Sequence, residues 1–328
     1  MSHGTLLYLN RDDVAGLGIG MNEVVAAVDQ ALREKGRGRA VMPPKLSLHG
    51  EAGAFSQVMA AALPGVGGLG VKWVTIVPAN AAAGLPTVNG LIVVNDPADG
   101  RPVAIMDASL VTAWRTGASA GVAARYLARA DVECVGVVGC GVQARGAVDA
   151  LAVVLPELRA VRCFDVVAAA VASFVDELQA RHPDLEFIDC PAAREVPRGS
   201  GVVVSAITMS DDVEPALDAG LLEPGALAVA LDYDAAWSAA AMAECGRFFC
   251  DDTAQVLATR AAGPRLQGIP NEIAGDLGEL AAGTIAGRWD DAERLFCMNL
   301  GVAVEDVVTA RLVLERAREL GVGRELPL

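Results

Sequence analysis

The chain has 328 residues and a formal net charge of −15; 53% of its residues are hydrophobic and 20% are charged. This length exceeds what one hydrophobic core usually holds, and the composition is typical of a folded protein with large buried sheets. The negative charge repels phosphate backbones and anionic lipid surfaces, so we expect neither nucleic acid nor membrane as a partner.

Several features of the sequence indicate a cytoplasmic protein. The apolar runs are shorter than the roughly 20 residues of a membrane helix, and the first residues lack the basic and apolar regions of a secretory signal. The seven cysteines form no C-x-x-C pair, and His3, His49 and His182 lie far apart. We therefore expect free thiols in a reducing compartment, and neither a histidine metal site nor a Ser-His-Asp triad.

The first part of the chain predicts a helix followed by a sheet. Apolar residues recur at helical spacing from Met21 to Leu32, before a Gly/Arg break. Short β-rich runs between Gly, Pro and Asn-Asp signals then favour a mixed or antiparallel sheet, with strands in 42–50, 54–63, 69–78, 87–96 and 101–107. Residues 109–129 are rich in alanine and predict a long helix.

After Asp131 the pattern changes to strands that alternate with helices, which is typical of a doubly wound parallel sheet. The predicted strands are 132–138, 160–165, 186–190, 201–207 and 225–232, and the predicted helices are 142–155 and 168–182. The last segment, 289–323, predicts one short apolar strand and a long amphipathic helix.

A glycine-rich turn, VVGCGVQA, follows the first of these strands and opens a helix. Gly139, Gly141 and Ala144 fill the G-x-G-x-x-[GA] spacing. Gly139 permits the tight turn, Gly141 leaves room for a pyrophosphate, and the helix N-terminus offers free N–H groups to the phosphates. Asp165 ends the next strand, where a carboxylate hydrogen-bonds ribose hydroxyls. No arginine follows it to pair with a 2′-phosphate, so the turn predicts NAD(H) as cofactor, with NADP disfavoured by Asp165.

Upstream of the turn, cations stand in apolar surroundings at Lys45, Lys72 and Arg115. Burial of the Lys72 ammonium within a strand is costly without an anion, and the planar fork of an arginine can hold a carboxylate at two points. Each of these cations alone is more often a snorkelling or salt-bridged side chain. Together, in an acidic protein, they indicate a small substrate that carries a carboxylate.

Asp232 ends a predicted strand of the parallel sheet, at the edge where such sheets bind ligands. A carboxylate there can exchange a proton with the amine of a substrate, or orient water against an imine carbon. Asp234 competes for this role, and the spacing does not choose between the two.

Together these motifs resemble the ornithine cyclodeaminase/μ-crystallin family, especially its archaeal-type alanine dehydrogenase branch. The resemblance covers nearly the whole chain and rests on MPPK, GVKWV…P.N…GLPTV, MDAS…T..RTGAS, GCGVQA, the strand-end FD and NLGVAVED. It implies a Rossmann-type doubly wound α/β domain and an α+β substrate-binding and dimerisation domain, built from the N-terminal region and the C-terminal helix. The expected domains are 1–125, 126–299 and the returning helix 300–328, in a homodimer.

The resemblance also implies roles for individual residues. It places Lys72 and Asp232 in catalysis, with Lys72 beside the amino or imino group. Substrate contacts are implied for Lys45, Thr87, Arg115 and Leu300, with the α-carboxylate held by Lys45 and Arg115. Cofactor contacts are implied for Thr116, Val142, Gln143, Asp165, Thr208 and Asn299, beside the glycines Gly139 and Gly141.

Some positions depart from the family pattern. Cyclodeaminases have arginine at the position of Lys45, so the lysine resembles the alanine dehydrogenase branch instead. That branch, however, has an arginine at the position of Gln57. Asn89 and Gly90 replace larger apolar residues, which predicts room for a substrate larger than alanine. These departures bear on the substrate rather than on the cofactor.

The features above predict an enzyme, namely an NAD(H)-dependent amino-acid dehydrogenase or imine reductase that acts on the CH–NH2 or C=N group of a small amino or imino acid. One alternative is an ornithine- or lysine-type cyclodeaminase, which recycles NAD internally while a ring closes and ammonia leaves. The other is a non-enzymatic cofactor-binding protein like μ-crystallin, which would not need Lys72, Arg115 and Asp232 together.

Overall fold

The computed structural model describes residues 4–51, 53–209 and 214–328, so His3 lies outside the described residues. The chain forms two compact units: unit 1 comprises Met1–Arg115 and Val302–Leu328, and unit 2 comprises Thr116–Gly301. The boundary near residue 115 falls within helix α3 (Ser109–Leu127). The functional domains expected at 1–125, 126–299 and 300–328 stay a prediction. In the part of the chain that is described, no helix combines the length and the apolar character that crossing a membrane requires.

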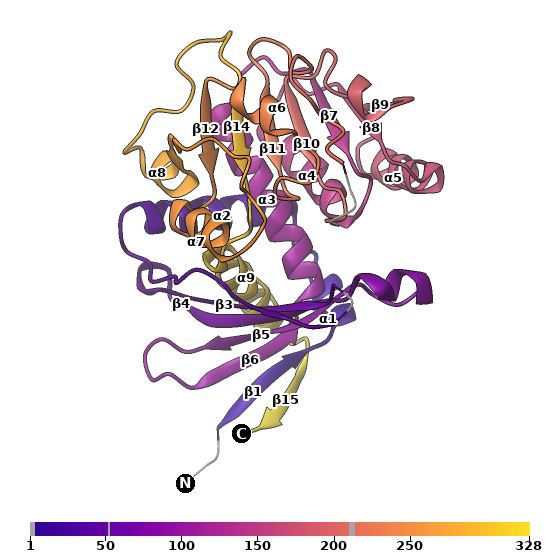
Figure 1. The fold of residues 1–328 in the computed structure, drawn as a ribbon. Helices are drawn as coiled ribbons and strands as arrows, with labels where there is room; N and C mark the ends of the chain where they lie inside the picture. Colours follow the sequence, from indigo (N-terminus) through magenta and orange to yellow (C-terminus); the bar gives the residue numbers. More distant parts are fainter. Residues whose placement is uncertain (1–3, 52, 210–213) are drawn as a thin grey trace. The chain divides into compact units, whose positions relative to one another are not determined.

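Unit 1 is built on a seven-stranded sheet (Figure 1). The sequence predicted a mixed or antiparallel sheet, and the sheet is mixed. In spatial order its strands are β15 (Arg324–Pro327), β1 (Thr5–Leu9), β6 (Pro102–Asp107), β5 (Val88–Asn95), β4 (Gly68–Ile76), β3 (Phe55–Leu63) and β2 (Leu46–His49). Strands β1 and β6 pair in parallel, and the other neighbours pair antiparallel.

Helices cover one face of this sheet. Helix α9 (Ala303–Leu320) packs against β3, β4 and β5, and α2 (Met21–Gly36) packs against α9. The apolar residues of α9 recur at helical spacing, so that Ala310, Val313 and Ala317 reach the core beside Ile92 and Met106. A short helix, α1 (Arg11–Ala15), follows β1. The long C-terminal helix predicted from the amphipathic pattern is confirmed.

Unit 2 contains an eight-stranded sheet in which all neighbours pair in parallel. In spatial order its strands are β13 (Gly275–Asp276), β12 (Arg247–Cys250), β14 (Leu295–Met298), β11 (Leu227–Ala230), β10 (Val202–Ser205), β7 (Cys134–Val138), β8 (Ala160–Phe164) and β9 (Glu186–Asp189). Its helices after α3 are α4 (Val142–Val154), α5 (Ala168–Arg181), α6 (Ala239–Ala243), α7 (Thr253–Ala262) and α8 (Leu277–Ala282). The predicted doubly wound Rossmann-type sheet is therefore confirmed.

The chain order reverses at β7, because β8 and β9 extend the sheet on one side and β10 and β11 extend it on the other. Ligands of doubly wound sheets bind at the carboxyl ends of the strands beside such a reversal. The glycine turn follows β7 directly, and Ser205 ends β10. We therefore expect a ligand to bind at these two strand ends.

Several elements were not predicted from the sequence. Strands β1 and β15 are short, and each gains its partner from the far end of the chain. Strands β12 and β13 and helices α6, α7 and α8 are also short, with at most ten residues each. Periodicity over so few residues is weak, so tertiary pairing decides whether such segments become regular.

Candidate active site

The turn between β7 and α4 has the geometry of a dinucleotide-binding loop. Gly139 has a φ of +91°, and a Cβ there would lie 2.6 Å from the carbonyl oxygen of Ala206, so the position requires glycine. Gly141 is the N-cap of α4, and among the described residues no side chain caps the helix and no atom lies within 4 Å of where a Cβ would be. The space in front of this helix end is therefore open to an anionic group.

Asp165 follows β8 and contacts the same turn. One carboxylate oxygen accepts a hydrogen bond from the backbone N–H of Cys140 at 2.8 Å, and the other accepts from Val167 N at 2.9 Å. Each oxygen has a second lone pair with which it can accept from a ligand hydroxyl. The next residue, Val166, is 89% exposed and brings no positive charge to this position.

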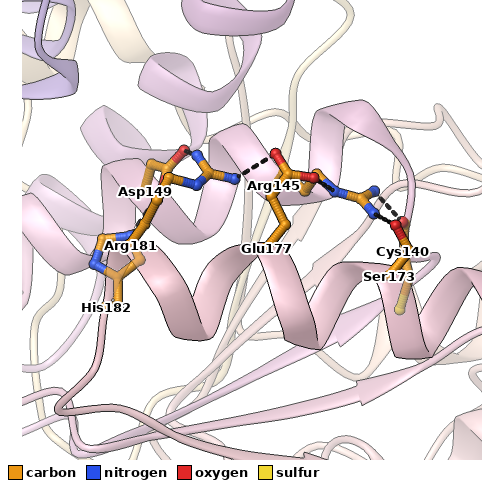
Figure 2. Close-up of polar contacts among 7 residues, drawn as sticks. All are labelled: Cys140, Arg145, Asp149, Ser173, Glu177, Arg181 and His182. Carbon is orange, nitrogen blue, oxygen red and sulfur yellow. Dashed lines mark hydrogen bonds and ion pairs between the residues drawn. The ribbon is translucent and has the colours of Figure 1, made fainter.

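Arg145 of α4, which no sequence motif singled out, ties the turn to helix α5 (Figure 2). Its guanidinium donates to the carbonyl oxygen of Cys140 and pairs with Glu177, whose carboxylate lies 2.6 Å from Nε. Glu177 also pairs with Arg181, and Arg181 pairs with Asp149 on α4. A chain of alternating charges thus runs along α4 and α5 and ends on the glycine turn.

The remaining residues expected to contact a cofactor differ in burial. Asn299 is buried just after β14, and its side-chain nitrogen donates to Ser119 Oγ at 2.9 Å. Gln143 has a buried Oε1 to which no described residue donates a hydrogen bond, and such an atom calls for a donor. Of the others, the buried residues are Thr116 and Leu300, and the exposed ones are Val142 and Thr208.

In unit 1, one carboxylate brings two of the predicted cations together. Oδ1 of Asp306, in the first turn of α9, lies 2.7 Å from Lys72 Nζ and 2.9 Å from Arg115 Nε. Glu305 Oε2 lies 3.1 Å from Arg115 Nη1. All four side chains are buried, and their two positive and two negative charges balance. The cations expected to meet a substrate carboxylate therefore already have anionic partners within the protein.

Lys72 has an unusual acidity in this environment. Burial, followed by the nearby charge of Arg115, lowers the pKa of Lys72 to about 8, although Asp306 opposes the shift. The charge of Lys45 also lowers the pKa of Lys72, by less than that of Arg115, so Lys45 too lies near Lys72. With a pKa this close to neutrality, Lys72 can exchange a proton with a bound amine or imine.

The strand register places Lys45 and Lys72 on one face of the sheet. Met59 of β3 pairs with Lys72, and Leu46, the first residue of β2, pairs with Val58. Continued by one residue, this register puts Lys45 opposite Met59. Residues directly opposite one another on paired strands share a face. This is the face that α9 covers, because Lys72 reaches Asp306 there.

Two further positions flank this face. Gln57 of β3 pairs with Val74, two residues beyond Lys72 on the same side of β4. Gln57 therefore places an uncharged carboxamide on the same face of the sheet as the two lysines. Thr87 immediately precedes β5, and its carbonyl oxygen accepts a hydrogen bond from Val77 N at 2.8 Å.

The expectation that Asn89 and Gly90 make room for a larger substrate stays a prediction. A Cβ at Gly90 would lie 2.3 Å from the carbonyl oxygen of Trp73, so the glycine permits close strand packing. Asn89 pairs with Thr75, which lies on the opposite face of β4 from Lys72. Gly90 instead pairs with Val74, which lies on the same face of β4 as Lys72.

In unit 2, Asp232 lies just beyond the carboxyl end of β11. Ser205 Oγ donates to Asp232 Oδ1 at 2.6 Å, and Ile207 N donates to Oδ2 at 2.9 Å. Burial raises the pKa of Asp232 to about 6, against these hydrogen bonds, which lower it. The neighbouring Asp234 instead accepts from Leu266 N at 2.8 Å. Asp232 is thus a buried carboxyl that titrates close to neutral pH.

The sequence analysis did not identify some residues that bind Lys72, Arg115 and Asp232. Asp306 carried a usable signal, because it lies four residues before Ala310 on the apolar stripe of α9. A charged residue at a core position predicts a buried partner of opposite charge. Ser205, which binds Asp232, carried no such signal, since serine is ordinary at the end of a strand.

The chain is similar to known proteins over nearly its whole length. The family model described as ornithine cyclodeaminase/mu-crystallin family matches residues 8–321. The alanine dehydrogenase of Archaeoglobus fulgidus is 33% identical over 327 residues, which cover 98% of each chain.

Two solved structures are similar to this chain along most of its length. The Thermococcus litoralis Δ1-pyrroline-2-carboxylate reductase, in complex with NADH and L-proline, has a TM-score of 0.88 at 30% identity, and the match covers 97% of this chain and 99% of that one. A dimer of an archaeal alanine dehydrogenase with bound NAD has a TM-score of 0.87 at 31% identity, covering 99% and 100%.

Proposed function

The chain belongs to the ornithine cyclodeaminase/mu-crystallin family, and from this premise we propose that it is an NAD(H)-dependent oxidoreductase acting on the CH–NH2 or C=N group of a small amino or imino acid. The observation that carries the proposal is the glycine turn, where the open space at Gly141 and the carboxylate of Asp165 together fit a dinucleotide. The NAD-bound and NADH-bound relatives support this choice of cofactor.

Bound cofactor supplies the hydride exchange with the substrate carbon. The chain's own residues hold the substrate and move its protons. We assign the α-carboxylate to Lys45 and Arg115, and the amino or imino nitrogen to Lys72. Lys72 and Asp232 share the proton transfers, for which pKa values of about 8 and about 6 are suited.

The other assignments follow the family resemblance. Substrate contacts are assigned to Thr87 and Leu300. Cofactor contacts are assigned to Thr116, Gly139, Gly141, Val142, Gln143, Asp165, Thr208 and Asn299. We also propose a cytoplasmic location, which the seven cysteines support, because their side chains are thiols and thiols persist in reducing compartments.

A substrate screen tests the function. Amino acids are offered with NAD, and cyclic imino acids, or 2-oxo acids with amines, are offered with NADH, while NADH absorbance and ammonia are both followed. A sustained change in NADH is the expected result. Release of ammonia without such a change would identify a cyclodeaminase, and cofactor binding without any turnover would identify a binding protein.

We expect the enzyme to prefer NADH over NADPH by about 100-fold or more in kcat/KM, because a 2′-phosphate would meet the Asp165 carboxylate. Asp165→Asn removes the charge and should reduce this preference to about tenfold or less. Steady-state kinetics with both cofactors measure the ratio. Asp189→Asn is the control, since Asp189 is an exposed acid at the end of the neighbouring strand β9. Equal use of both cofactors by the wild type would contradict the assignment of Asp165.

We further propose that the chain forms a homodimer through the outer face of the unit 1 sheet. Leu46, Val58, Trp73 and Leu91 lie directly opposite one another across β2, β3, β4 and β5, on the face away from Lys72. Leu46, Trp73 and Leu91 are 58%, 47% and 44% exposed. A contiguous exposed apolar row is typical of an interface, and the archaeal alanine dehydrogenase is a dimer.

Trp73→Glu should convert the dimer to a monomer at micromolar concentration, because it places a charge in the middle of this apolar row. Sedimentation velocity measures the change in mass. Val166→Glu is the matched control, since Val166 is an exposed apolar residue of unit 2. A Trp73→Glu protein that still sediments as a dimer would exclude this face as the interface.

A further inference from the structure

A buried chain of three polar side chains lies at the carboxyl ends of β10 and β11. Trp237 Nε1 lies 3.0 Å from Ser205 Oγ, and Ser205 Oγ lies 2.6 Å from Asp232 Oδ1. None of the three residues is more than 1% exposed. Because water does not compete for buried hydrogen bonds, each member of such a chain holds the next in a defined position.

The hydrogen bonds in this chain have one direction. An indole N–H only donates, so Trp237 occupies a lone pair of Ser205 Oγ. Serine has a single hydroxyl proton, and at 2.6 Å that proton points to Asp232 Oδ1. The indole thereby selects the orientation of the hydroxyl that donates to Asp232.

The second oxygen of Asp232 is held by the same strand end. Ile207, two residues after Ser205, donates its backbone N–H to Asp232 Oδ2 at 2.9 Å. The carboxylate is therefore gripped at both oxygens, and both donors favour its ionised form. Asp234 is the neighbouring charge that acts in the opposite sense, raising the pKa of Asp232.

The backbone beside Asp232 is also constrained. Tyr233 has a φ of +60°, a left-handed conformation that a bulky residue rarely adopts. Such strain persists where the surrounding structure imposes it, and it is found most often at functional sites. At this position the strain accompanies a carboxyl with fixed hydrogen-bond donors.

We propose that Ser205 and Trp237 are positioning residues for Asp232: the indole sets the direction of the serine hydroxyl, and the hydroxyl holds the carboxylate in the orientation and ionisation state that proton transfer needs. This inference rests on the proposed role of Asp232 in proton transfer. A merely structural role for Trp237 and Ser205 would affect stability without changing the pH at which Asp232 titrates.

Ser205→Ala should move the Asp232-dependent limb of the pH profile of kcat/KM upward by about one pH unit, because one hydrogen bond to the charged carboxylate is lost. Trp237→Phe should move it in the same direction by less, since the hydroxyl remains but loses its fixed direction. Ser205→Thr keeps a hydroxyl and should restore the wild-type profile. Asp234→Asn should move the limb downward, because a charge that raises the pKa of Asp232 is removed.

Carbon-13 NMR of labelled aspartate carboxyls reads the same titration without turnover, with the Asp232 signal identified by its loss in Asp232→Asn. An unchanged pKa in folded Ser205→Ala and Trp237→Phe proteins overturns the proposal, even where activity falls. If Ser205→Ala does not fold, Trp237→Phe decides, because it keeps an aromatic ring against Phe296. Absence of turnover in the wild type would count against the proposed function, and the NMR titration would still decide the positioning role.

Discussion

Asp232→Asn is expected to lower kcat/KM for the amino or imino acid by about 10²–10⁴-fold, because the substitution removes a group that exchanges protons with the substrate. The Kd for NADH, measured by fluorescence, should stay near the wild-type value. Asparagine has nearly the same shape; its oxygen can accept from Ile207 N while its amide nitrogen donates to Ser205 Oγ, so we expect the fold to be preserved. Asp234→Asn is the matched control, with an expected loss of less than about tenfold.

The pH dependence follows from the raised pKa of Asp232. Oxidation of an amine needs the ionised carboxylate as base, so kcat/KM should rise with pH through about 6. Reduction of an imine needs the protonated acid, so kcat/KM in that direction should fall as the pH rises through the same value. Asp232→Asn should abolish this limb in both directions. Wild-type turnover in the variant would remove Asp232 from the mechanism and direct attention to Lys72 alone.

Asp306→Asn is expected to lower the free energy of unfolding by about 3–5 kcal/mol at neutral pH, because it leaves the buried ammonium of Lys72 without its carboxylate. Arg115 loses an ion-pair partner in the same substitution. Denaturant unfolding followed by circular dichroism measures the change. The catalytic rate should fall as well, since Lys72 and Arg115 are assigned to the substrate.

The loss of stability in Asp306→Asn should shrink above about pH 8, where Lys72 of the folded wild type gives up its proton and only the pair between Arg115 and Asp306 remains to be broken. Glu319→Gln is the control on the same helix, because Glu319 is exposed and lies 3.5 Å from Arg316. Such a surface pair contributes about 0–1 kcal/mol. A loss in Asp306→Asn no larger than in Glu319→Gln would show that the buried pair does not support the fold.

The glycine turn and its acid were predictable because their geometry is local. Gly139 needs a positive φ and Gly141 needs open space at the start of a helix, and both requirements are met within one strand, turn and helix. Asp165 directly follows the next strand, so the alternation of strands and helices was enough to place it beside the turn. The parallel sheet of unit 2 follows from the same alternation, since each buried strand is a continuous apolar run.

The amino-acid sequence by itself therefore determined the two kinds of sheet, the dinucleotide-type turn, and the presence of cations in apolar surroundings. Tertiary structure alone decided what those cations meet. Lys72 and Asp306 are 234 residues apart in the chain, and β1 joins β15 from the opposite end. The same holds for Ser205 and Trp237 around Asp232. Periodicity reports which face of an element is buried, but the partner on the other side depends on which distant segments pack together, and no local pattern encodes that choice.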